Sequence, residues 1–188
     1  MKYKLILSSN SPRRKELLAG LDMDFEVKVL PDIAESYPEF LPVSEIPVYI
    51  AKEKALAYLE GIAADELVIT ADTVVVLDDE VLGKPVDAAD AFRMLKLLSG
   101  KTHQVITGVC LTTKEKQHSF SVSTDVTFKE LSDEEIHYYI NKYSPLDKAG
   151  AYGIQEWIGY IGVTGISGSY FNVVGLPVQR IYQELLKM

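Results

Sequence analysis

The chain has 188 residues, 47% of them hydrophobic, which is enough for one folded domain with its own core. A formal net charge of −8 excludes general affinity for the phosphate backbone of nucleic acids, so an anion site would need a local group of Lys and Arg side chains. The single cysteine, Cys110, excludes an internal disulfide, and we expect a buried, unreactive thiol. Without a leader signal or an apolar run of ~20 residues, we expect a cytoplasmic protein with no membrane and no nucleic-acid polymer as partner.

The first half of the chain alternates strands and helices. Apolar runs and turn signals predict strands over 3–8 and 25–29, helices over 12–20 and 45–60, and a loop rich in Pro and acidic residues over 31–42. The sequence ELVITADTVVVL then predicts a strand that ends at Thr70 and a second run over 73–77, so we expect Asp72 at a strand end. A helix over 87–98 follows, with Gly100 as its stop signal.

The second half predicts a long hairpin, with arms over 103–113 and 118–128. A helix begins at the capping box of Ser132 and Glu135, and another is opened by Pro177 after a glycine-rich stretch. This pattern predicts an α/β fold in a single domain over 1–188. We expect a mixed, bent β-sheet flanked by helices, with the long hairpin at its centre and a cleft between two lobes.

The sequence SSNSPRR places two arginines in the first turn of the predicted helix over 12–20. Cations there are unfavourable beside the positive end of the helix dipole, unless an anion joins them. The hydroxyls of Ser8, Ser9 and Ser11, the N–H groups of the turn and the guanidiniums of Arg13 and Arg14 could together hold a phosphate.

The alternative for this turn is a solvated helix start. Its arginines would then pair with nearby acids, and the sequence offers Asp24, Asp32 and Glu35.

A second group of candidates surrounds Asp72. A carboxylate beside apolar strands either pairs with a cation or takes part in chemistry. The structural alternative is an ion pair with Lys84, which follows Gly83 in a turn. The functional alternative is a carboxylate that faces a phosphate-bound Mg²⁺ and orients or deprotonates a water. Lys54 lies on a partly apolar stripe of its helix, which allows an inward-pointing ammonium.

Gln155 lies in the glycine-rich stretch. Its amide can donate and accept at once, which matches a base edge with a carbonyl beside an N–H, as in uracil and thymine. An ordinary polar loop residue is the alternative.

Five blocks in order, SSNSPRRKELL, ADTVVVLDDEVLGKP, AFRMLKLLSGKTHQVITGV, LDKAGAYGIQ and GSYFNVVGLP, resemble the Maf family of nucleoside triphosphate pyrophosphatases. The resemblance implies hydrolysis between the α- and β-phosphates of a nucleotide, with a divalent metal cation, Mg²⁺ or Mn²⁺. The form DKAGAYGIQ is similar to the dTTP/UTP branch of the family. The resemblance also implies a homodimer as the expected assembly.

Carried over position by position, the resemblance implies that Asp72 accepts the proton of the attacking water. It assigns base specificity to Arg13, Thr73 and Gln155. It assigns the phosphate-binding cleft to Ser9, Ser11, Arg14, Lys54 and Lys84, and it matches Glu35 to an acid of the cleft or the metal. The chain departs from the family pattern at Glu156, where a Gly is usual, which adds a negative charge beside the expected base pocket.

Two other classes of function remain open on the sequence. A non-catalytic nucleotide-binding regulator of septum formation would keep the phosphate site without turnover. A partner-binding protein acting in cell division would have no saturable nucleotide affinity. As an enzyme, the protein could remove modified pyrimidine nucleotides or take part in the arrest of cell division.

Overall fold

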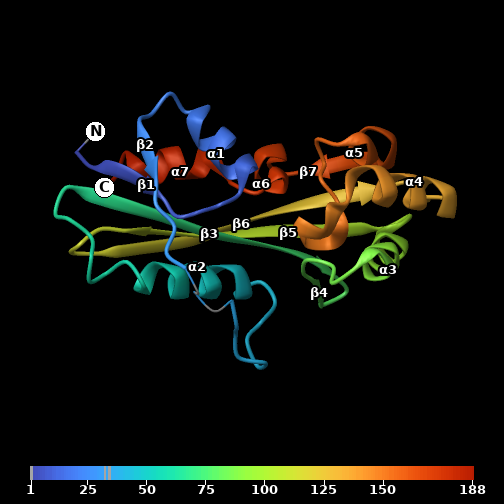
Figure 1. The fold of residues 1–188 in the computed structure, drawn as a ribbon, viewed down its shortest axis with the longest axis horizontal. Coiled ribbons are helices and arrows are strands. Elements are labelled where there is room, and N and C mark those ends of the chain that lie inside the picture. Colours follow the sequence, from blue (N-terminus) through green and yellow to red (C-terminus); the bar gives the residue numbers. More distant parts are fainter. Residues whose placement is uncertain (1, 32, 34) are drawn as a thin grey trace. The chain divides into compact units, whose positions relative to one another are not determined.

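The structure is a computed structural model, and it describes residues 2–31, 33 and 35–188. Figure 1 shows its elements along the chain. They are β1 (Lys4–Leu7), α1 (Pro12–Ala19), β2 (Phe25–Val27), α2 (Ile46–Leu56), β3 (Glu66–Leu77), β4 (Glu80–Leu82), α3 (Ala88–Leu98), β5 (Thr102–Thr112), β6 (Gln117–Phe128), α4 (Asp133–Tyr143), the 3₁₀ turns η1 (Pro145–Asp147) and η2 (Ala149–Ala151), α5 (Trp157–Gly162), β7 (Val163–Ser167), α6 (Tyr170–Val174) and α7 (Val178–Leu185). No helix in the described part of the chain has the length and apolar composition that crossing a bilayer requires.

The strands form one mixed sheet in the order β2-β1-β3-β5-β6-β7, and β4 pairs with β3. Strand β1 is parallel to β2 and β3, whereas β4 is antiparallel to β3 and β7 to β6. The predicted mixed α/β sheet is therefore confirmed. The predicted hairpin corresponds to the neighbouring strands β5 and β6.

The chain forms two compact units. Unit 1 consists of Met1–Thr73, Thr107–Val122 and Gly175–Met188, and unit 2 of Val74–Ile106 and Ser123–Val174. The chain passes from one unit to the other within β3, β5 and β6, so neither unit is a continuous segment. The single domain and the cleft between lobes stay predictions.

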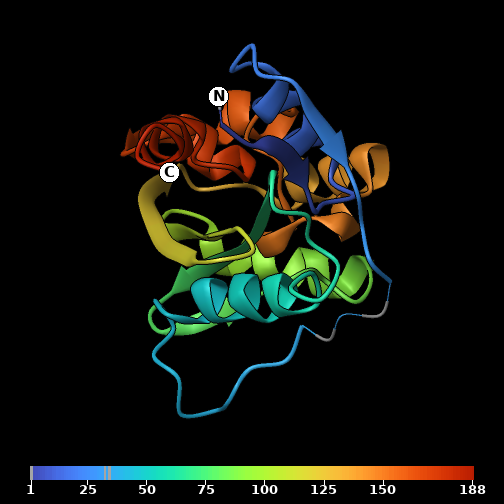
Figure 2. The same ribbon diagram turned by 90° about the vertical axis from the view of Figure 1, so that its left-hand side faces the viewer.

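Unit 1 has helices on both faces of its strands. Figures 1 and 2 show α1 and α7 on one side and α2 on the other. Successive strand residues point to opposite faces, so Leu5 and Leu7 pack with α1 and α7, while Ile6 packs with Tyr58 on the other face. The outcome is a helix–sheet–helix arrangement that fixes the ends of β1 and β3.

The contact between α2 and β5 is close. A side chain at Gly108 would overlap the backbone of Pro47 and Val48, so this position of β5 requires glycine. Cys110, two residues further along β5, is fully buried against Ala51 and Ala55 of α2. Burial raises the pKa of the Cys110 thiol, which confirms the expectation of a buried thiol in its neutral form.

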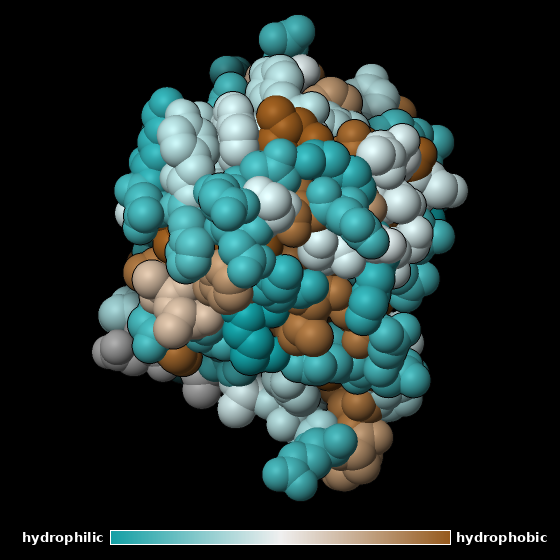
Figure 3. Space-filling model, turned by 90° about the vertical axis from the view of Figure 1, so that its right-hand side faces the viewer, coloured by the Kyte–Doolittle hydropathy of each residue, from teal (hydrophilic) through white to brown (hydrophobic). Residues whose placement is uncertain are grey.

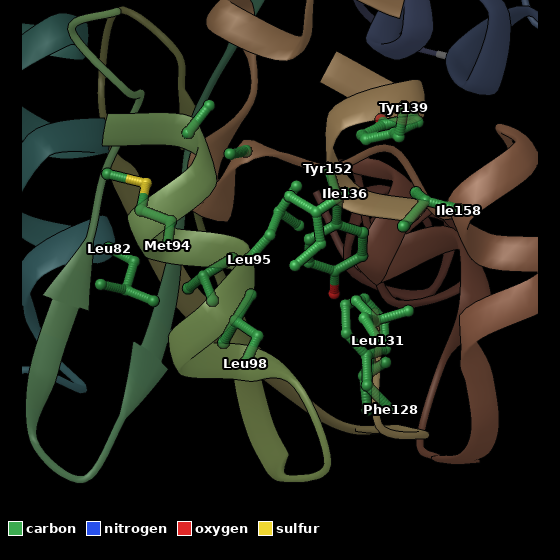
Figure 4. Packing of buried hydrophobic residues seen from close by; sticks show 14 of the residues in the cluster. Leu82, Met94, Leu95, Leu98, Phe128, Leu131, Ile136, Tyr139, Tyr152 and Ile158 are labelled. Carbon is green, nitrogen blue, oxygen red and sulfur yellow. The ribbon is translucent and has the colours of Figure 1, made fainter. Parts of the chain in front are cut away.

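Unit 2 has one continuous hydrophobic core. Figure 4 shows α3 residues such as Met94 and Leu95 packed with α4 residues such as Ile136, and Tyr139 lies in the same cluster. The opposite faces of these helices carry charges, including an exposed ion pair of 2.8 Å between Lys96 and Asp133. Hydrophilic residues accordingly predominate on the side at the right of Figure 1, where hydrophobic residues form small separate groups (Figure 3).

Helix ends follow the sequence closely. Ser132 and Glu135 form the predicted capping box of α4, and Gly100 has a positive φ of 71° just after α3. Pro177 is the N-cap of α7 rather than its first helical residue. The glycine-rich stretch contains four elements that the pattern did not predict, η2, α5, β7 and α6.

The expectation that a strand ends at Thr70 is wrong. Strand β3 continues through Asp72 and Thr73 to Leu77. A polar side chain is tolerated in a buried strand when it has a hydrogen-bond or ion-pair partner. Here both side chains have one, because Asp72 pairs with Lys54 and Thr73 accepts a hydrogen bond from Arg14.

His103 is a buried titratable group in unit 2. Its Nε2 lies 2.7 Å from the Tyr152 hydroxyl, and its ring packs edge-on against Phe128 and Tyr152. Burial lowers the pKa of His103 from 6.5 to about 4. The folded state therefore holds a neutral imidazole across the physiological range.

We expect the free energy of unfolding to fall as the pH drops from about 6.5 to about 4, by on the order of 3 kcal/mol. In this interval the unfolded chain takes up the proton of His103 and the folded protein does not. His103→Gln should remove this part of the pH dependence, and replacement of the exposed His137 by Gln should keep it. Urea unfolding of the three proteins at several pH values measures the effect, and equal slopes for wild type and H103Q would contradict it.

Candidate functional site

The turn between β1 and α1 in unit 1 is closed by two serines. Ser11 is the N-cap of α1, and its side chain accepts the N–H of Arg14 at 3.4 Å. The Ser9 hydroxyl accepts the N–H of Ser11 at 3.2 Å. Ser8 does not join them, because it is buried and its hydroxyl donates to the Tyr58 hydroxyl at 2.7 Å. The phosphate cradle expected from three serines is thus reduced to Ser9 and Ser11.

Arg14 is held by three acceptors from two segments of unit 1, strand β3 and the chain at Gly175. Its Nε donates to the carbonyl of Gly175 at 2.9 Å, one terminal nitrogen to the carbonyl of Ala71 at 2.9 Å, and the other to Thr73 Oγ1 at 3.0 Å. A guanidinium has five N–H donors, so these three bonds leave two for a ligand. Burial lowers the pKa of Arg14, the charge of Arg13 acts in the same direction, and the charge of Asp72 opposes both.

Thr73 is part of the same network. Its hydroxyl accepts from Arg14 and lies 2.9 Å from the hydroxyl of Thr107, which is fully buried in β5. Thr107 could not be predicted from the sequence, because a threonine within the strand VITGVCLTT carries no signal of its own. Arg14 and Thr73 are therefore placed together by contacts that join four distant parts of the chain.

Lys54 of α2 lies between two carboxylates. Its Nζ is 3.0 Å from Asp72 Oδ1 and 2.7 Å from Glu35 Oε1. The side chains of Lys54 and Asp72 are only 12% and 14% exposed, whereas Glu35 is 50% exposed. The inward-pointing ammonium predicted for Lys54 is present, and Asp72 pairs with it rather than forming the alternative ion pair with Lys84.

In unit 1 these groups lie beyond the carboxyl ends of the paired parts of β1 and β3. Strand β1 runs parallel to the first part of β3, with Leu7 opposite Ile69, so the serine turn and Asp72 both follow the carboxyl ends of parallel pairs. In α/β proteins this is the edge where ligands bind. Glu35, one of the acids considered as partners of the arginines, is paired with Lys54. Asp32 lies outside the described residues.

The carboxylates of Asp72 and Glu35 are the side chains here that could bind a metal ion. Among the described residues no group of three or more His, Cys, Asp and Glu side chains is arranged to hold a metal ion. Asp72 and Glu35 are two hard carboxylates beside one ammonium, and Mg²⁺ is commonly held by one or two carboxylates together with substrate phosphates. The residues fit a divalent cation that arrives with a phosphorylated substrate, and they do not form a complete cage alone.

Lys84 and Gln155 belong to unit 2. Lys84 is exposed and follows Gly83, whose carbonyl accepts the N–H of Gly150 at 3.0 Å. Gly150 has a φ of 68°, and a side chain there would lie 2.8 Å from Val75. This contact joins the turn with Lys84 to the segment that leads to Gln155, and glycine is required for it.

Gln155 occupies a tight turn. The N–H of Glu156 donates to the carbonyl of Gly153 at 3.0 Å and closes the turn around it. Gln155 Oε1 is buried and has no hydrogen-bond partner among the described residues. A buried acceptor without a donor is costly, so this oxygen is suited to accept a hydrogen bond from a ligand.

The extra charge of Glu156 is neutralised within unit 2. Its Oε2 accepts the hydroxyl of Tyr139, and its Oε1 lies 3.2 Å from the ammonium of the buried Lys148. Lys148 also donates to Asp147 at 2.8 Å. The carboxylate is paired on both oxygens.

Together these features define an α/β protein in which a serine-capped turn and a paired carboxylate both follow the carboxyl ends of parallel strand pairs, an arrangement suited to an enzyme that acts on phosphorylated substrates. Residues 4–188 match the family model described as Maf-like protein, and the chain belongs to this family.

Curated relatives are similar over almost their whole length. A protein of Phocaeicola vulgatus named dTTP/UTP pyrophosphatase is 68% identical over 187 residues, covering 100% of this chain and 97% of that protein. Proteins with the same name from Parabacteroides distasonis and Bacteroides thetaiotaomicron are 61% and 60% identical and cover 98% and 100% of this chain and 95% and 97% of their own. A solved dITP/XTP pyrophosphatase of Mycobacterium abscessus aligns with a TM-score of 0.48 and 17% identity over 98% of this chain and 100% of its own, too distant for inference.

The residues assigned by resemblance fall into two groups. Unit 1 contains Ser9, Ser11, Arg13, Arg14, Glu35, Lys54, Asp72 and Thr73, and unit 2 contains Lys84 and Gln155. Their individual roles stay predictions.

We expect Arg14→Lys to lower the free energy of unfolding by about 2 kcal/mol. The guanidinium donates to its three acceptors from three separate nitrogens, and the single nitrogen of a lysine side chain cannot replace all three hydrogen bonds. The matched control is Arg93→Lys, at an exposed arginine that pairs with Glu80 and Asp90, where the change should stay within about 0.5 kcal/mol. Chemical denaturation measures both, and equal losses would contradict the structural role of Arg14.

Proposed function

We propose that this protein hydrolyses dTTP and UTP between the α- and β-phosphates, giving the nucleoside monophosphate and pyrophosphate. The observation that carries the proposal is the pairing of Asp72 with Lys54 at 3.0 Å, next to the serine turn at the ligand-binding edge of the sheet. The relatives named dTTP/UTP pyrophosphatase, at up to 68% identity over the whole chain, support the substrate class.

In this mechanism Asp72 orients a water for in-line attack on a phosphorus. Its Oδ1 is engaged by Lys54, and its Oδ2 takes the proton as the new P–O bond forms and the bond to the bridging oxygen breaks. Lys54 keeps the carboxylate in one orientation. The N–H groups of the turn at Ser11 and the two remaining donors of Arg14 bind phosphate oxygens, which carry most of the negative charge.

A divalent cation, Mg²⁺ or Mn²⁺, is part of the proposal. Asp72 and Glu35 would hold it together with phosphate oxygens, and when bound it neutralises charge on the phosphates. Pyrophosphate release with each cation, and with a chelator, tests the requirement.

The assembly and location are also proposals. We propose a homodimer in the cytoplasm, supported by the resemblance to the family, with a nucleoside triphosphate and no nucleic-acid polymer as partner, which the net charge of −8 supports. Light scattering after size-exclusion chromatography tests the dimer, and cell fractionation tests the location.

The second candidate is a non-catalytic, nucleotide-binding regulator of septum formation. It would keep the phosphate-binding turn but would have no need for a proton acceptor at Asp72 beside Lys54. Pyrophosphate release from UTP separates the two. A screen of modified pyrimidine triphosphates in the same assay tests a role in removing such nucleotides, and a cell-division assay of the inactive variant tests the septum role.

We expect Asp72→Asn to lower turnover by about 10³-fold, because the amide retains an oxygen for Lys54 but cannot accept the proton. Nucleotide binding without a divalent cation, measured by calorimetry, should change by no more than several-fold, because the Asp72 carboxylate is proposed to act on the water and the cation rather than on the nucleotide itself. The matched control is Asp79→Asn in the turn after β3, where a positive φ of 66° is one that Asn tolerates. Near-normal pyrophosphate release by D72N would overturn the assignment of Asp72.

We expect Gln155→Ala to raise KM for UTP and dTTP and to lower the preference for UTP over CTP about tenfold, because the unpartnered amide oxygen is lost. Replacement of the exposed Gln104, which donates to Asp125, by Ala serves as the control. Steady-state kinetics with both nucleotides measure the effect. An unchanged preference would remove Gln155 from base selection.

A further inference from the structure

One tyrosine hydroxyl contacts both ends of the turn that carries Gln155. The Tyr139 hydroxyl accepts the N–H of Gly153 at 3.0 Å and donates to the side chain of Glu156. The backbone bond from Glu156 to Gly153 closes the same four residues. A single oxygen of α4 thus holds both ends of the turn. We call its two hydrogen bonds, to Gly153 and to Glu156, the clasp.

Tyr139 itself is immobilised by its surroundings. It is fully buried, its ring stacks on Tyr143 at 5.2 Å between centroids, and it belongs to the hydrophobic core of unit 2 (Figure 4). Burial and the Glu156 carboxylate raise the pKa of the Tyr139 hydroxyl, so it stays protonated and remains a donor. A fixed ring therefore presents a fixed hydroxyl to the turn.

Glu156, which accepts the hydrogen bond of the Tyr139 hydroxyl, is also paired with a lysine. Lys148 lies 3.2 Å from the second oxygen of Glu156, and Lys148 is itself buried. A side chain at Gly153 would lie 3.0 Å from Cδ of Glu156 and 3.1 Å from Cε of Lys148. The turn is consequently packed directly against the two paired side chains, with little space for a side chain at Gly153.

Gln155 is the residue of this turn whose amide oxygen is buried without a partner among the described residues. Nothing within that part of the structure hydrogen-bonds to this oxygen, so its place depends on the side-chain rotamer and on the backbone of the turn that carries the side chain. The backbone in turn depends on the clasp at Gly153 and Glu156.

We propose that Tyr139 is a positioning residue for base selection, which acts through Glu156 and Gly153 to hold the Gln155 amide in the orientation that accepts the N–H of uracil or thymine. Tyr139 does not touch the substrate in this scheme. The inference rests on the proposed function, because it requires that Gln155 reads the base. It also assigns a role to Glu156, the residue at which the chain departs from the family pattern.

The test compares Tyr139→Phe with Tyr143→Phe. Both keep an aromatic ring in the same stack on α4, but only the first removes the hydroxyl of the clasp. For Y139F we expect the ratio of kcat/KM for UTP over CTP to fall about tenfold, mainly through KM for UTP, with kcat changed little. For Y143F the ratio should stay within about twofold of wild type. A loss of activity with both nucleotides at an unchanged ratio would show a merely structural role and overturn the proposal.

A second readout needs no substrate. Hydrogen exchange of the Gly153 N–H should accelerate at least about tenfold in Y139F and stay unchanged in Y143F, since only Y139F removes its acceptor. Faster exchange at an unchanged UTP-to-CTP ratio would show that the clasp holds the turn without setting base choice, which overturns the proposal. Absence of base preference in wild type and in Q155A alike would instead overturn the proposed function, and the exchange data would still report on the clasp.

Glu156 variants test the same chain of contacts from its other end. Glu156→Gln keeps an oxygen that can accept the Tyr139 hydroxyl, whereas Glu156→Ala removes it. We expect the UTP preference to decrease in the order wild type, E156Q, E156A. A preference that is lost equally in E156Q and E156A would point to the charge pairing with Lys148 rather than to the hydroxyl, and would contradict the proposal.

Discussion

Two adjacent polar residues in the middle of a buried strand are the constraint on which unit 1 depends. Asp72 and Thr73 lie within β3, where a polar group without a partner would lower the free energy of unfolding. Lys54 from α2 pairs with the first, and Arg14 from α1 pairs with the second. Since each partner comes from a different helix, satisfying these two side chains also fixes where α1 and α2 lie on the sheet, and it brings together the groups that the chemistry needs.

The same side chains serve the fold and the site. Arg14 uses three donors on Gly175, Ala71 and Thr73, so its charge is positioned by structure before any ligand binds. Pre-positioned charge is what electrostatic catalysis requires, because no reorganisation is then needed as charge moves on the phosphates. An acidic protein thus concentrates two cations in one unit, with Arg14 held by two carbonyls and a hydroxyl and Lys54 held by two carboxylates.

Much of the architecture could be predicted from local patterns. The N-cap at Ser11, the capping box at Ser132 and the hairpin arms follow from residue types a few positions apart, and the resemblance of five blocks indicated the family. The continuity of β3 through Asp72 could not be predicted, because it depends on partners 18 and 59 residues away. Ser8 could not be assigned either, since only the fold reveals that Tyr58 takes its hydroxyl.

Periodicity of the strands and helices, the caps at their ends and the family could all be predicted from the amino-acid sequence, because they depend on neighbouring residues or on ordered motifs. Which charges pair became visible in the folded chain. The fold placed Lys54 between Asp72 and Glu35, gave Arg14 three acceptors and clasped the Gln155 turn with Tyr139. The reason is physical: hydrogen bonds and ion pairs act over about 3 Å in space, and separation along the chain does not reveal which groups the sheet brings within that distance.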